Sequence, residues 1–114
     1  MFKMNGKVTD LKVAWERMSD NEKNLWHIHN DAGMEQMSLG NMGKFKYHES
    51  MILIFQGDFV RAHETLKFGC SMLQDSSCCY SLEFLGDFEQ TKQELSLKIE
   101  EMKDTMINNY KNRL

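Results

Sequence analysis

The sequence predicts an all-α fold, a small helical bundle built from two helical hairpins. The chain contains no proline, the residue that most strongly disrupts a helix interior. It contains ten methionines, whose unbranched apolar side chains suit helices that pack on helices. A short motif with Gly-Asp at its centre also occurs twice. We therefore expect one domain over residues 1–114, with two Gly-Asp-turn hairpins, a long C-terminal helix and N-terminal helices packed on it.

Two N-terminal helices are expected within residues 9–31. The pattern Ser19-Asp20-Asn21-Glu22 is a capping box, in which a serine and a glutamate three residues later satisfy free backbone N–H groups. A helix should begin there and end at Gly33, since glycine takes the left-handed conformation that terminates many helices. A shorter helix from about Thr9 to Met18 precedes it, and the two could instead form one continuous helix.

Glycines at positions 33, 40 and 43 predict a Gly-rich loop over residues 33–43, with room for one helical turn from Met34 to Met37. The next stretch, residues 44–55, fits either a helix or a β-hairpin. Phe45 and Tyr47 alternate with polar residues, whereas residues 51–55 are continuously apolar, and periodicity alone does not separate the two possibilities. The repeated motif downstream favours a helix, which then opens a first hairpin over residues 44–73.

The motif Phe55-Gln56-Gly57-Asp58-Phe59 returns 29 residues later as Phe84-Leu85-Gly86-Asp87-Phe88. Around it, residues 53–66 and 82–95 share six identities in fourteen positions. Gly-Asp between two apolar segments has a physical role at a helical turn. Glycine ends the first helix at positive φ, and aspartate caps the next helix. We therefore predict structural turns at Gly57, Asp58, Gly86 and Asp87.

The second hairpin is expected over residues 77–111, with a long final helix from about Phe88 to Lys111. Apolar residues in this helix follow a heptad-like seam, which is typical of coiled coils. The seam predicts self-association as a homodimer, unless the N-terminal helices fold back and cover it. Its residues are Leu95, Ile99, Met102 and Met106.

A helix–Gly-Asp–helix unit used twice resembles the helical hairpins of tetratricopeptide repeats, over about residues 44–101. The run Gln56-Gly57-Asp58-Phe59 is similar to the turn of that family, and Ala62, Leu66 and Gly69 are similar to its packing positions on the second helix. The resemblance implies helical-hairpin geometry and a helical surface that holds a segment of a partner protein.

The composition argues against several classes of function. Hydrophobic residues make up 41% and charged residues 27%, and the formal charge is −3, which is typical of a globular chain. No apolar run reaches the roughly 18 residues of a membrane span, and we see no apolar stretch at the start that would serve as a signal peptide. The excess of acidic over basic residues argues against nucleic acid as a partner and against binding to an anionic membrane.

The histidines and cysteines do not indicate a catalytic, metal or cofactor site. His27 and His29 lie on opposite sides of a helix and cannot chelate one metal ion together. The spacings of zinc proteases and di-iron bundles do not occur. The three cysteines are few and odd in number, so we expect reduced thiols, Cys70 as a small apolar residue, and a cytoplasmic location in a bacterial or host cell.

We therefore expect a non-catalytic helical module that binds a segment of a partner protein, with an apolar stripe lying in a groove. Candidate partner-binding residues are Trp26, Tyr47, His48 and His63. An alternative is a small-molecule or nucleotide-binding helical bundle, whose pocket adds Trp15 to these four residues. A second alternative rests on composition alone and is a small phage-encoded inhibitor of a host protein.

Overall fold

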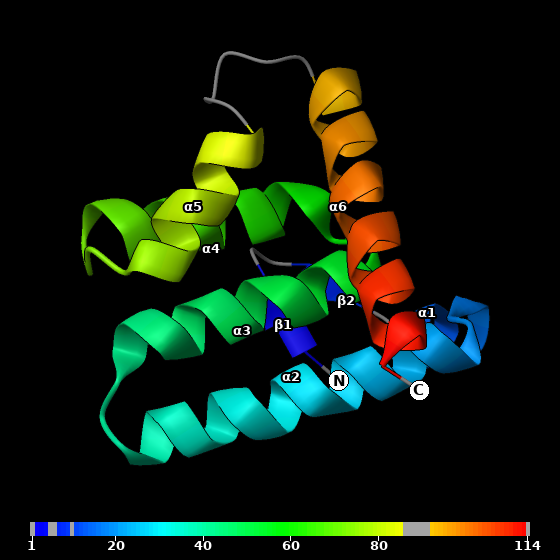
Figure 1. The fold of residues 1–114 in the computed structure, drawn as a ribbon, viewed down its shortest axis with the longest axis horizontal. Coiled ribbons are helices and arrows are strands. Elements are labelled where there is room, and N and C mark those ends of the chain that lie inside the picture. Colours follow the sequence, from blue (N-terminus) through cyan, green and yellow to red (C-terminus); the bar gives the residue numbers. More distant parts are fainter. Residues whose placement is uncertain (1, 5–6, 10, 86–91, 114) are drawn as a thin grey trace.

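The computed structural model describes residues 2–4, 7–9, 11–85 and 92–113, and these form six helices and one short strand pair. The predicted all-α bundle is confirmed (Figure 1). Strand β1 (Phe2–Met4) pairs antiparallel with β2 (Lys7–Thr9), a hairpin that we did not predict. The helices are α1 (Leu11–Arg17), α2 (Asp20–Ser38), α3 (Met42–Gln56), α4 (Phe59–Ser71), α5 (Ser76–Leu85) and α6 (Lys92–Asn112).

The predicted capping box is confirmed at the start of α2. The Ser19 hydroxyl accepts a hydrogen bond from the Glu22 backbone N–H at 3.2 Å, and the Glu22 carboxylate accepts one from the Ser19 N–H at 3.0 Å. These two bonds begin a new helix directly after α1, so α1 and α2 stay separate.

The prediction that Gly33 ends this helix is wrong, and so is the predicted loop over residues 33–43. Helix α2 continues through Gly33 to Ser38, and the chain reverses at Gly40, which has a φ of +77°. Gly33 is buried against α3, where an added Cβ would lie 3.1 Å from the Cβ of His48. The glycine therefore allows two helices to approach closely, a role that its sequence position does not distinguish from a helix stop.

Residues 44–55 are helical and belong to α3, which confirms the first helix of the predicted hairpin. Gly57 ends α3 with a φ of +86°, in the left-handed region as predicted. Asp58 stands at the N-cap of α4 but makes no capping bond, which corrects our expectation for this residue. Its carboxylate instead accepts from the Gln56 side chain at 3.5 Å and lies 4.0 Å from Arg61 Nη1.

The second predicted turn, at Gly86 and Asp87, lies outside the described residues. Helix α5 precedes this gap and α6 follows it. The expected reduced state of all three cysteines is wrong, because Cys70 on α4 and Cys79 on α5 form a disulfide. The bridge joins residues nine positions apart across the turn between the two helices, so it ties α5 to α4. Cys78 is a free, buried thiol.

The main core lies where α3, α4, α5 and α6 meet. Its fully buried members include Ile54, Leu66, Leu85 and Ile99, one from each of these helices. A smaller cluster of Met18, Leu25 and Phe55 packs α2 against α3. In Figure 1, α2 and α3 run side by side and α6 crosses one end of both. An ion pair between Glu22 on α2 and Lys103 on α6, at 3.0 Å, strengthens that crossing.

Candidate functional site

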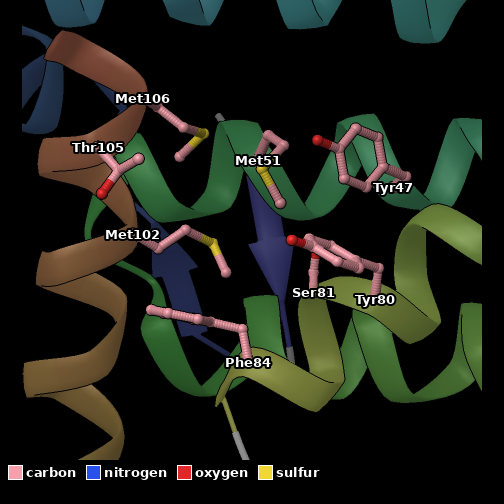
Figure 2. A pocket seen from close by; sticks show the side chains of 8 residues that line it. All are labelled: Tyr47, Met51, Tyr80, Ser81, Phe84, Met102, Thr105 and Met106. Atoms are coloured by element: carbon pink, nitrogen blue, oxygen red, sulfur yellow. The ribbon is translucent and has the colours of Figure 1, made fainter. Parts of the chain in front are cut away.

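A groove opens where α6 meets helices α3 and α5. Its first part is a cavity of about 270 Å³. Figure 2 shows side chains from all three helices pointing into it. The lining consists of Tyr47, Met51, Tyr80, Ser81, Phe84, Met102, Thr105 and Met106.

One end of the groove is apolar, and we call it the methionine end: Met51 from α3, Phe84 from α5, and Met102 and Met106 from α6. Met51 is buried and lines the same cavity as the other three. Phe84 leaves 47% of its surface exposed although it lies on the groove. Methionine side chains are flexible and polarisable, so a surface made from them can adapt to apolar groups of different shape.

The other end of the groove is lined by hydroxyl groups, and we call it the hydroxyl end: Tyr47, Ser76, Ser77, Tyr80 and Ser81. They surround a second cavity of about 360 Å³. Three of the five also line the first cavity, so the two cavities form one continuous groove. Helix α5 supplies four of the five side chains, because Ser76, Ser77, Tyr80 and Ser81 recur at about one helical turn.

These hydroxyls have no hydrogen-bond partner among the described residues. Ser81 is only 8% exposed as a residue, but its hydroxyl oxygen faces the groove and is accessible to solvent there. Burial raises the pKa of the Tyr47 hydroxyl, and the nearby Cys78 and Asp75 raise it further. Tyr47 therefore keeps its proton near neutral pH and can both donate and accept a hydrogen bond.

The described lining of the groove contains no charged side chain. Asp75 is close to the hydroxyl end, but its carboxylate already accepts a hydrogen bond from the Cys78 backbone N–H at 3.0 Å, as the cap of α5. Burial raises the pKa of the Cys78 thiol to about 12, so this thiol remains protonated and is a poor nucleophile. The groove is therefore suited to binding uncharged groups, and its residues offer no evident acid–base or nucleophilic chemistry.

The four predicted partner-binding residues do not form one surface. Tyr47 lies in the groove. Trp26 instead donates a hydrogen bond to Gln56 at 3.1 Å and packs edge-on against Trp15. His63 is buried within α4 and is not accessible to a partner. The alternative ligand pocket that adds Trp15 fails for the same reason, since its members lie in separate parts of the molecule.

His48 belongs to a histidine pair between α2 and α3. Its Nδ1 lies 2.9 Å from Nδ1 of His29, a distance at which one ring donates a hydrogen bond and the other accepts it. Burial, together with the neighbouring His48, lowers the pKa of His29 to about 4. Burial and Lys44 also lower the pKa of His48, against an opposing effect of Asp75. The pair is therefore neutral near pH 7 and helps to hold α2 on α3.

The predicted self-association seam divides into two parts. Leu95 and Ile99 are buried in the core of this same chain, so they cannot also contact a second copy. Met102 and Met106 line the groove. The expectation of a dimer through the whole seam is therefore wrong for its first half, because α3, α4 and α5 already cover it.

Sequence reasoning missed Met51, Tyr80, Ser81 and Phe84 as groove residues. A signal for part of the groove was present: Tyr80 and Phe84 are four residues apart on α5, as are Met102 and Met106 on α6, so each pair shares one helix face. The sequence does not reveal that these two faces meet above Met51, because that depends on how α6 crosses α5.

A scan of protein-family models, a search of curated proteins and a search of solved structures found no match to this chain. Within the described residues, no three histidine, cysteine, aspartate or glutamate side chains converge to hold a metal ion. None of the helices in the described segments has the length and apolar composition that crossing a bilayer requires. The structure thus defines an all-α bundle with an uncharged groove, methionine-rich at one end and hydroxyl-lined at the other.

Proposed function

We propose that this protein is a non-catalytic interaction module that binds an amphipathic helical segment of a partner protein in the groove between α3, α5 and α6. The observation that carries the proposal is the methionine end, where flexible apolar side chains stand beside a half-exposed Phe84. Met-rich apolar grooves suit the apolar face of a helix, and large aromatic side chains at their rims often dominate the binding energy.

The extent of the groove suits a protein segment, because two cavities of about 270 and about 360 Å³ join along α3, α5 and α6. The methionine end is large enough for apolar anchor side chains that project from a helix lying across the groove. A nucleotide is disfavoured, because the described lining offers no lysine or arginine to a phosphate group.

The tetratricopeptide-like character of residues 44–101 stays a prediction. It agrees with the proposal in one respect, since it implies a helical surface that holds a partner segment. We do not propose self-association through the α6 seam, because Leu95 and Ile99 are buried within the chain.

The test is a selection of helical peptides from a display library on the immobilised full chain. We expect enriched peptides to carry apolar residues at i, i+3 or i+4, and i+7. Binding of a synthesised peptide from this selection should weaken at least about tenfold when Phe84→Lys or Met102→Lys places a charge in the methionine end. Circular dichroism checks that both variants remain helical.

The matched control is Leu97→Lys. Leu97 is also on α6 and is 66% exposed, but it does not line the groove. This variant should bind the selected peptide like the wild type. Peptides that bind all three variants equally, or a selection without any helical pattern of anchors, would contradict the proposed function.

A further inference from the structure

The hydroxyl end of the groove has more hydrogen-bonding capacity than the described chain uses. Ser81 is more than nine-tenths buried and lines both cavities, yet its hydroxyl has no partner among the described residues. The half-buried Tyr47, on the facing helix α3, likewise has no hydrogen-bond partner for its hydroxyl among the described residues. Both hydroxyls are accessible to water in the groove, so an occupant that displaces this water must replace its hydrogen bonds.

The chemistry of that group follows from the lining. A hydroxyl can donate one hydrogen bond and accept others, so a cluster of hydroxyls best matches a group that also does both. A charged group would lose its hydration here without meeting an opposite charge on the described lining, which is unfavourable. A purely apolar group would leave Ser81 and Tyr47 without partners once water is displaced.

We infer that the partner helix carries an uncharged carboxamide side chain, from asparagine or glutamine, about one helical turn beyond its apolar anchors, and that this side chain binds the hydroxyls of Ser81 and Tyr47. This inference rests on the proposed function and specifies the partner that the groove selects. The apolar anchors occupy the methionine end, and the carboxamide, with its C=O acceptor and NH₂ donor, occupies the hydroxyl end. The groove thus excludes helices that carry a carboxylate or an ammonium group at this position.

The test is a double-mutant cycle between the protein and a selected, synthesised helical peptide that contains such a glutamine. On the wild-type chain, replacing that glutamine with methionine should weaken binding about three- to tenfold, the value of one or two hydrogen bonds. Replacing it with glutamate should weaken binding more than about tenfold, because the carboxylate is desolvated without a partner cation.

On the Ser81→Ala and Tyr47→Phe variants, the loss caused by the glutamine-to-methionine change should shrink to less than about twofold. The control variant is Ser71→Ala, which removes an exposed hydroxyl outside the groove, one that donates to the Lys67 carbonyl. It should preserve the full discrimination seen with the wild type. Measuring the apolar peptide on every variant separates lost specificity from misfolding, since a folded groove still binds it.

The possible failures are distinguishable. If the selected peptides depend on Phe84 but lack a carboxamide at this position, or bind equally well with glutamate there, this inference is overturned and the proposed function stands. Equal losses on the wild-type and Ser81→Ala chains overturn it as well. A selection that yields no groove-dependent peptide overturns the proposed function and this inference together.

Discussion

The core between α3 and α4 and the groove beside α5 and α6 are built from different side chains. The core uses Ile54, Ala62 and Leu66, all of which are fully buried. The groove uses methionines, hydroxyls, and the aromatic rings of Phe84 and Tyr80, which are 47% and 78% exposed. The comparison indicates that most of the free energy of folding comes from the core, whereas the groove leaves large apolar side chains partly exposed.

The largest difference is expected from truncating one large apolar side chain in each region. Leu66→Ala should lower the free energy of unfolding by about 2–5 kcal/mol, because it removes buried methyl groups and leaves a cavity. Phe84→Ala should cost about 1 kcal/mol or less, since half of that ring is already exposed. Urea denaturation of both variants measures the difference. Similar losses would show that the groove is as tightly packed as the core.

Removing the disulfide should loosen the groove before the core. The Cys70–Cys79 bridge joins residues nine positions apart in the sequence. Loss of such a cross-link lowers the free energy of unfolding by about 2–3 kcal/mol, because the unfolded chain gains conformational entropy. Hydrogen exchange of a Cys70→Ser, Cys79→Ser variant should show faster exchange in α5, which forms one wall of the groove. Exchange in α2 and α3 should change less. A uniform increase over all helices would argue against separate behaviour of the two regions.

Acid should weaken the packing of α2 on α3 through the histidine pair. The unfolded chain protonates His29 below about pH 6.5, whereas the folded chain does so only near the lowered pKa of about 4. Between about pH 6.5 and about pH 4 the unfolded state binds more protons than the folded state, so the free energy of unfolding falls as the pH falls. The part of this loss that comes from His29 should be at most about 2 kcal/mol between about pH 8 and about pH 5.

Thermal or urea unfolding at several pH values measures this slope. His29→Gln should make the curve flatter over that range. The control His27→Gln changes an exposed histidine on the same helix and should keep most of the slope. Parallel curves for the wild type and His29→Gln would show that the pair does not couple pH to folding.

Local signals in the sequence predicted several helix ends correctly. The capping box at Ser19 and Glu22 and the positive φ of Gly57 depend on residues close in the chain, so pattern alone predicts them. Gly33 was misjudged because its role depends on His48 of the facing helix. The Cys70–Cys79 bridge likewise depends on the turn that brings α4 and α5 together.

Of the groove residues, the sequence predicted only Tyr47 as a partner-binding residue. Met102 and Met106 were predicted as well, but as self-association residues. Apolar spacing on α6 indicates a packing face, but it does not say which neighbour covers each residue. In the structure, Leu95 and Ile99 are covered by the core, whereas Met102 and Met106 border the groove. That division follows from the angle at which α6 crosses α3 and α5, a property of the three-dimensional arrangement.

The most direct test of the groove as a binding site is a titration of methionine-methyl NMR signals with a peptide from the display selection. We expect the methyl signals of Met51, Met102 and Met106 to shift. The signals of Met34 and Met72, which are exposed outside the groove, should stay in place. Shifts confined to Met34 and Met72, or peptide binding without any shift at the three groove methionines, would contradict a partner site between α3, α5 and α6.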